Sequence, residues 1–220
     1  MTIMEHDRNN ILKGYNLLLY FAGSMIMSEP TDECVVDFWT NGTLKKLPVS
    51  SLNPRFLKAA SLLRDPCEDK VKCRQMLADD YFNLFDERVL PFAPARASIY
   101  LAGRNNGVPV EMEVAEFYNS YGWHPIKPGK PADHLGIELL FLTKLVEKYL
   151  LLDDEPSCCE MKKEICRFIK NYILSWVPSW DENVQEHAHT QSFKGISTLI
   201  YACTEDLYGI FSNVETRQNN

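Results

Sequence analysis

Apolar residues recur along most of the chain at the three- and four-residue spacing that is typical of amphipathic helices. The first such stripe lies within residues 7–27 and consists of Ile11, Leu12, Tyr15, Leu18, Leu19 and Ala22. This spacing predicts a first core helix. No alternating run of β-branched residues follows further along the chain, so no sheet is predicted.

Capping residues and further stripes predict the other helices. The expected ranges are 31–39, 54–63, 68–86, 109–121, 133–152, 157–177 and 179–214, the last with a break near Gly195. Asn53 followed by Pro54 is a cap with proline in the first turn. Ser157 to Glu160 and Ser179 to Glu182 have the spacing of capping boxes. The predicted fold is all-α, an irregular bundle of about eight to ten helices.

One segment interrupts the helical pattern completely. Residues 122–132, "GWHPIKPGKPA", contain three prolines and two glycines. Proline removes a backbone donor and glycine lowers helix propensity, so this segment is a loop. We expect a single domain over residues 1–220 in which this loop is a hinge between an N-terminal and a C-terminal half.

Composition narrows the class of protein. The chain has 220 residues, a net charge of −7 and a pI near 5.3. No basic stripe is present, so no nucleic-acid partner is expected. The apolar run at residues 17–27 is too short to span a membrane and lacks the features of a signal peptide, so no stable membrane insertion is expected. Seven irregularly spaced cysteines indicate reduced thiols and a cytoplasmic location.

A polar pair opens the most apolar of the predicted helices. Asp133 stands where an N-cap residue belongs and His134 follows it, directly before "LGIELLFL". A cationic histidine is disfavoured at a helix N-terminus, so His134 is expected to be neutral, either as a hydrogen-bonding group or as a half-buried packing residue. Glu138 lies on the same helix face as His134. These two could be metal ligands of a hydrolase, but a site needs a third ligand.

Other signs of catalysis are missing from the sequence. No nucleophile elbow, phosphate-binding loop or dinucleotide fingerprint occurs. We therefore predict no catalytic residue, no metal site and no cofactor. Three aromatic residues, Tyr100, Tyr121 and Trp123, could line an apolar groove near the proline-rich loop, or could belong to the core.

These motifs together resemble the TorD/DmsD/NarJ family of redox-enzyme maturation chaperones. Pro131-Ala-Asp-His134 is similar to the family's Glu-Pro-x-Asp-His signature, and Tyr121-Gly-Trp123 stands upstream of it. The segment "LFDERVLPFAPARASIYL", with Ser98-Ile-Tyr100 near its end, resembles a second family segment. The stretch from Tyr172 to Ser197 resembles the family's tryptophan-proline junction and late helix. Where the family has a glutamate, this chain has Lys130.

The resemblance implies a binding protein rather than an enzyme. Its ligand would be the twin-arginine signal peptide, or the apo-form, of a molybdenum oxidoreductase, held in the cytoplasm before cofactor insertion and export. The implied peptide-binding residues, at the rim and wall of a groove, are Tyr100, Tyr121, Trp123, Pro131, Asp133, His134 and Glu138. A homodimer could form by exchange of halves across residues 122–132. The alternatives are the metal-dependent hydrolase and an assembly factor that binds only the body of its client.

Overall fold

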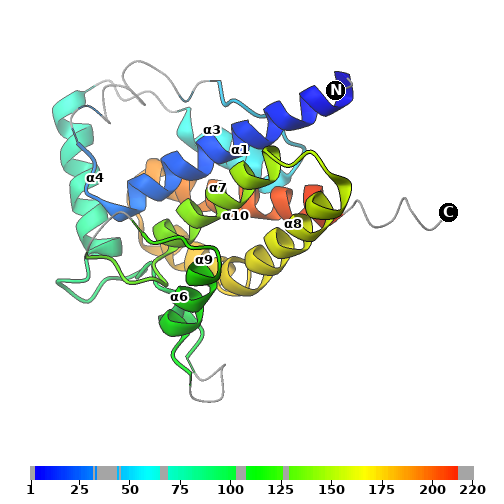
Figure 1. The fold of residues 1–220 in the computed structure, drawn as a ribbon. Helices are drawn as coiled ribbons and strands as arrows, with labels where there is room; N and C mark the ends of the chain where they lie inside the picture. The colour runs from blue at the N-terminus through cyan, green and yellow to red at the C-terminus, as the bar shows by residue number, and fades with distance from the viewer. Residues whose placement is uncertain are drawn as a thin grey trace.

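The protein is a helical bundle built around two central helices, as seen in a computed structural model that describes residues 3–31, 33, 44, 46–64, 69–102, 108–125 and 129–212 (Figure 1). The helices are α1 (Ile3–Met27), α3 (Pro54–Leu63), α4 (Lys70–Phe85), α5 (Ala97–Tyr100), α6 (Val110–Ser120), α7 (Leu135–Leu150), α8 (Glu155–Phe168), the π-helix η3 (Ile169–Ile173), α9 (Val177–His187) and α10 (Gln191–Ser212). No strand occurs among the described residues. The all-α prediction is confirmed, whereas most of the helix expected at 31–39 falls outside the described residues.

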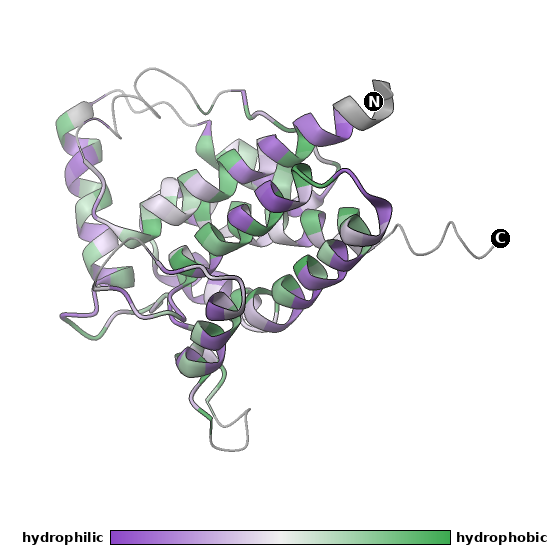
Figure 2. Cartoon of the chain, viewed as in Figure 1, coloured by the Kyte–Doolittle hydropathy of each residue, from purple (hydrophilic) through white to green (hydrophobic). Residues whose placement is uncertain are grey.

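The core lies around α7 and α10. Consecutive residues from Leu135 to Leu139 are buried, so the first part of α7 is enclosed on all sides, whereas Lys144, Glu147 and Lys148 further along are exposed. Helix α1 lies across α7, and α3 packs against α10. In Figure 1, α4 stands at one edge of the molecule and α8 runs along another. Hydrophobic and hydrophilic stretches alternate along α1 and α8, as expected for amphipathic helices that cover a core (Figure 2).

Helix α8 begins earlier than the capping-box prediction. Asp154, not a residue of the expected box, is the N-cap, and its carboxylate accepts a hydrogen bond from the Ser157 backbone N–H at 2.8 Å. Pro156 occupies the first turn, where its missing N–H costs nothing. The box expected at Ser179 is also wrong, because α9 already begins at Val177.

The last predicted helix is two helices, and the break between them is not at Gly195. Helix α9 ends at His187 and α10 begins at Gln191. Asp80 of α4 accepts hydrogen bonds from the backbone N–H groups of His189 (3.0 Å) and Thr190 (2.6 Å). A carboxylate from a distant helix therefore fixes the break, whereas Gly195 continues the helix in close contact with α3.

The proline-rich loop has the backbone that its glycines allow. Gly122 (φ 63°) and Gly129 (φ 99°) both adopt left-handed conformations that other residues rarely adopt. The loop separates α6 from α7, and contacts between α1 and α7 join the two halves across it. The role of the loop as a hinge stays a prediction.

Cys73 is disulfide-bonded, so the expectation that all seven cysteines are reduced is wrong. Among the described cysteines, Cys158, Cys159, Cys166 and Cys203 are not disulfide-bonded. The described helices include none with both the length and the apolar composition needed to cross a membrane.

Candidate functional site

The segment around Asp133 and His134 pairs with the segment that follows α4. The Ala97 backbone N–H donates to the Asp133 carbonyl (3.0 Å), and the Leu135 N–H donates to the Ala95 carbonyl (2.8 Å). Arg96 and His134 form an isolated antiparallel bridge. Two stretches that the sequence analysis quoted separately are therefore joined by backbone hydrogen bonds.

Asp133 does not cap α7, contrary to the prediction. The N-cap is His134, whose Nδ1 accepts a hydrogen bond from the Gly136 N–H at 3.1 Å and is therefore unprotonated. Asp133 instead accepts a hydrogen bond from the Ser98 N–H at 2.9 Å. Because Ser98 is in the first turn of α5, Asp133 caps that short helix from across the chain.

Arg96 is surrounded by three carboxylates. Its guanidinium lies 3.4 Å from Asp133, 3.3 Å from Glu111 and 3.8 Å from Glu87. The Asp133 side chain has no exposed area, whereas those of Glu87 and Glu111 are 37% and 47% exposed. The cluster has one positive and three negative groups, so it has an excess of negative charge next to solvent.

Glu138 is fully buried, and neither of its carboxyl oxygens has a hydrogen-bond partner among the described residues. Burial raises its pKa well above the ordinary value, and the nearby charge of Asp133 raises this pKa further. The Trp176 indole N–H donates to the Tyr172 carbonyl at 2.6 Å, so it gives Glu138 no hydrogen bond. Burial without a partner therefore favours the neutral, protonated form of Glu138.

The predicted position of this pair at a groove rim is wrong. Asp133 and His134 are 0% and 1% exposed, so neither side chain reaches the surface in this structure. Pro131 is half-buried, and its carbonyl accepts the His134 N–H (3.1 Å) in the turn before α7. No group of three or more metal-ligating side chains occurs among the described residues, so the hydrolase alternative has no third ligand there.

The three predicted wall residues are in two different places. Tyr100 stacks on Trp176 with the ring centroids 5.2 Å apart, and its hydroxyl accepts a hydrogen bond from Asn183 at 3.3 Å. Tyr121 and Trp123 both pack against Phe141, at 5.6 Å and 5.2 Å, in an aromatic cluster between α6, α7 and α8. Only Tyr100 lines a surface pocket beside the Arg96 cluster.

That pocket has a volume of about 570 Å³ and is called the Phe92 pocket below. Its lining residues are Glu87, Val89, Leu90, Pro91, Phe92, Pro94, Arg96, Ile99, Tyr100 and Asn183. Leu90, Phe92 and Ile99 are 96%, 56% and 52% exposed. Because contiguous apolar surface of this kind is uncommon on a monomer, the pocket is the candidate interaction site.

Most of the pocket was not predicted from the sequence. Its apolar residues lie in "VLPFAP", part of a segment that resembles the family but carried no predicted site residue there. The available signal was the combination of large apolar residues with prolines, since a loop on the surface normally exposes polar side chains. Arg96 was missed because its three partners are distant in the sequence.

Lys130 lies beside a neighbouring group of charges. It lines a shallow pocket with Asp86, Glu87 and Arg88. Hydrogen bonds from Arg88 lower the pKa of Asp86 to about 2, and Lys130 contributes a smaller lowering. Lys130 therefore partly offsets the negative charge at this end of the site.

A comparison with known families decides what the chain is related to. The family model described as nitrate reductase delta subunit matches residues 50–182, more than half of the chain. The chain belongs to this family. The matched residues contain the whole Phe92 pocket except Asn183, together with the Asp133–His134 turn.

Curated relatives carry the name of a chaperone. A protein from Vibrio vulnificus (strain YJ016) named "Chaperone protein TorD" is 31% identical over 137 residues, which cover 61% of this chain and 63% of the relative. Another of that name, from Photobacterium profundum, is 24% identical over 174 residues, covering 76% and 79%. The chain thus spans less than two thirds of the Vibrio relative. These matches confirm the resemblance to the TorD/NarJ family.

Proposed function

We propose that the protein is a cytoplasmic chaperone for the maturation of a molybdenum-containing oxidoreductase. It would bind the twin-arginine signal peptide of that enzyme, its apo-form, or both, before cofactor insertion and export. Family membership and the names of the relatives support a chaperone rather than an enzyme. The observation that carries the proposal is the exposed apolar Phe92 pocket beside an acidic cluster.

This pocket complements both parts of such a leader. A signal peptide has a basic segment followed by an apolar helical segment. Apolar side chains of the leader would pack on Leu90, Phe92 and Ile99, and an arginine would reach the partly exposed carboxylates of Glu87 and Glu111. A guanidinium can form two parallel hydrogen bonds with a carboxylate, so arginine is preferred over lysine.

The buried residues of the signature would act indirectly. Asp133 caps α5, and α5 supplies Ile99 and Tyr100 to the pocket wall. His134 fixes the start of α7 beneath it. In the proposed function these two residues hold the wall in place, and the leader contacts that wall rather than the signature itself.

The test is a titration with a synthetic twin-arginine leader, observed by tryptophan fluorescence, beside a leader in which both arginines are lysine. Trp176 stacks on Tyr100 and is therefore a reporter of the pocket. We expect a dissociation constant of about 1 μM, weakened about tenfold for the lysine leader. The double change Leu90→Ser and Phe92→Ser should weaken leader binding by at least about tenfold.

A matched control uses two apolar residues that are exposed elsewhere. Val71 and Leu151 are 79% and 81% exposed and lie outside the pocket, so Val71→Ser with Leu151→Ser should leave the affinity unchanged. If both double variants bind like the unchanged protein, the Phe92 pocket is not the leader site. If several leaders fail to bind at all, the client body becomes the ligand, as in the assembly-factor alternative.

A further inference from the structure

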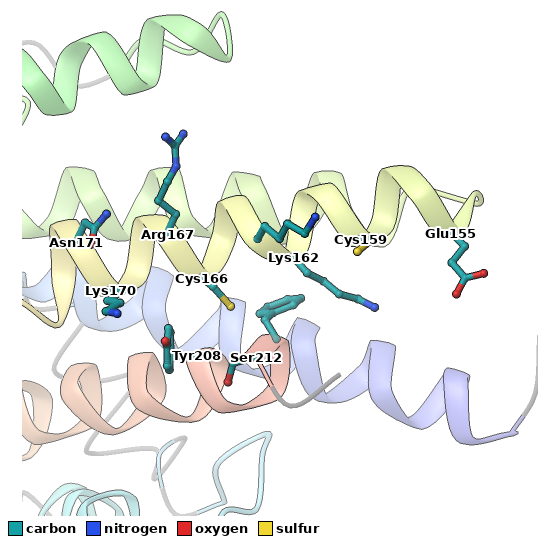
Figure 3. Close-up of a pocket in the computed structure, with 11 residues that line it drawn as sticks. Glu155, Cys159, Lys162, Cys166, Arg167, Lys170, Asn171, Tyr208 and Ser212 are labelled. Carbon is teal, nitrogen blue, oxygen red and sulfur yellow. The ribbon is translucent and has the colours of Figure 1, made fainter. Parts of the chain in front are cut away.

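A second surface pocket lies between α8 and the C-terminal end of α10 (Figure 3). Its volume is about 450 Å³, and it shares no residue with the Phe92 pocket. We call it the α8 groove. Its lining residues are Glu155, Cys159, Lys162, Lys163, Cys166, Arg167, Lys170, Asn171, Tyr208, Phe211 and Ser212.

The groove is basic, although the protein as a whole has a net charge of −7. Two of its cations are already paired, because Arg167 lies 2.6 Å from Glu164 and Lys163 lies 2.9 Å from Glu160. In Figure 3, Arg167 also points away from the groove.

Two further lysines of the lining, Lys162 and Lys170, are left after these pairs are counted. Glu155 is the single acidic residue of the lining that can balance their charge. Lys170 is exposed and makes no ion pair with any described residue. The rim therefore has uncompensated positive charge.

The floor of the groove is apolar. Phe211 is buried and Tyr208 is half-buried, and both come from α10. Figure 3 shows the Cys166 thiol directed from α8 toward Tyr208 and Ser212 across the groove. An apolar floor with a cationic rim complements a chain segment that carries both apolar and acidic side chains.

The shape of the groove favours an extended peptide over a small anion. It runs from Glu155 to Asn171, roughly 24 Å along the helix at 1.5 Å per residue. The lysines are spread along this length and do not converge on one point. A phosphate is typically held by convergent backbone N–H groups or by an arginine fork, and the groove presents neither. About seven residues of extended chain would span it.

We propose that the α8 groove binds an acidic segment of a partner protein in an extended conformation. Carboxylates of the segment would pair with Lys162 and Lys170, and an apolar side chain would pack on Tyr208 and Phe211. This site is separate from the proposed leader site and has the opposite charge preference. A basic leader is repelled by the groove, so the two ligands do not compete.

The test uses a fluorescein-labelled peptide of about eight residues that alternates Glu with Leu and Phe. The matched peptide has Gln in place of Glu. We expect the acidic peptide to bind, with an affinity that falls as salt is raised, and the Gln peptide to bind at least about tenfold more weakly. Lys162→Glu with Lys170→Glu should weaken binding of the acidic peptide by at least about tenfold.

The control variant is Lys13→Glu with Lys72→Glu, which makes the same change in net charge at exposed positions outside the groove. It should bind within about twofold of the unchanged protein. Equal losses in both variants would show a non-specific charge effect and overturn the proposal. Displacement of the peptide by inorganic phosphate, but not by chloride at equal ionic strength, would identify a small-anion site and overturn it as well.

The unchanged protein offers an independent readout through its own thiols. Cys159 is exposed and lines the groove, whereas its neighbour Cys158 does not line it. The acidic peptide should slow alkylation of Cys159 by iodoacetamide and leave Cys158 unaffected, as measured by mass spectrometry. Bound peptide without protection of Cys159 would place the site elsewhere and contradict the proposal.

Discussion

A buried carboxyl group without a hydrogen-bond partner is costly, and Glu138 is such a group. The change Glu138→Met keeps the length of the side chain and removes both unpaired oxygens. We expect the variant to be more stable by about 1–3 kcal/mol at neutral pH. Urea denaturation of both proteins measures the difference. A less stable variant would show that Glu138 has a stabilising partner in the folded protein.

The same residue predicts a pH dependence. The pKa of Glu138 is raised in the folded state, so the folded protein keeps this proton at pH values where the unfolded chain has lost it. The protonated Glu138 therefore contributes its full share to the free energy of unfolding below its ordinary pKa of 4.5. This contribution is lost as the pH rises toward the pKa of the folded state. The advantage of Glu138→Met should grow as the pH is raised above about 4.5. An advantage that shrinks over this range would contradict a raised pKa.

Asp133 joins two segments that are far apart in the sequence, so its removal should cost more than an ordinary cap. In Asp133→Asn the amide oxygen can still accept from Ser98, but the charge opposite Arg96 is lost. We expect a loss of about 1–3 kcal/mol for this variant and about 3–5 kcal/mol for Asp133→Ala, which also leaves α5 without its cap. The midpoints of urea denaturation of the two variants and the unchanged protein measure this order of stability. If the Asn and Ala variants are equally stable, Asp133 does not stabilise the protein by capping α5.

At the scale of elements, local signals predicted some helix boundaries and distant contacts decided the others. Helix α3 starts where the sequence predicts, because Asn53 caps its first turn and Pro54 occupies that turn. Helix α7 could not be assigned the right cap, because Asp133 is held by Arg96 and Ser98, which lie outside its own helix. Likewise the start of α10 depends on Asp80 of α4. The spacing of apolar residues along the sequence does not indicate such contacts between distant segments.

Gly195 is the clearest example of a misread signal in an element. Glycine in a helical pattern was interpreted as a break, but here it allows α10 to approach α3. A Cβ atom at position 195 would lie 2.8 Å from Cγ of the buried Leu63. We expect Gly195→Ala to destabilise the protein by about 1–3 kcal/mol through overpacking, although alanine is the better helix former.

Gly209 in the same helix is the matched control. An added Cβ there meets no heavy atom of another described part of the chain within 4 Å, so Gly209→Ala should stabilise the protein by about 0.5–1 kcal/mol. Thermal denaturation of both variants measures the contrast. If both changes shift the melting temperature in the same direction, close packing is not the reason for glycine at 195.

For the whole molecule, the helical spacing of apolar residues and the lack of alternating runs predicted the all-α fold, while the candidate site was only partly predictable. Of the predicted site residues, Asp133, His134 and Glu138 are buried behind the surface they were expected to form. The exposed part of the site is contributed by Leu90, Phe92 and Ile99, whose exposure depends on how the loop after α4 is anchored. The Trp180 indole N–H provides one such anchor by donating to the Ala93 carbonyl at 3.1 Å, across 87 residues.

The connection between the halves leads to a last prediction. Contacts of α1 with α7 and of α3 with α10 cross the loop at residues 122–132. If the loop opens, the same contacts can form between two chains, which gives a dimer without a new interface. Refolding from urea under reducing conditions should therefore give a dimer fraction that increases with protein concentration, as measured by size-exclusion chromatography with light scattering. The dimer should have the helix content of the monomer by circular dichroism, because exchange replaces each contact with its equivalent. It should also separate slowly on dilution, since separation requires the halves to come apart. A dimer that forms quickly from native protein and dissociates at once on dilution would instead use an exposed surface, and exchange across this loop would be excluded as its cause.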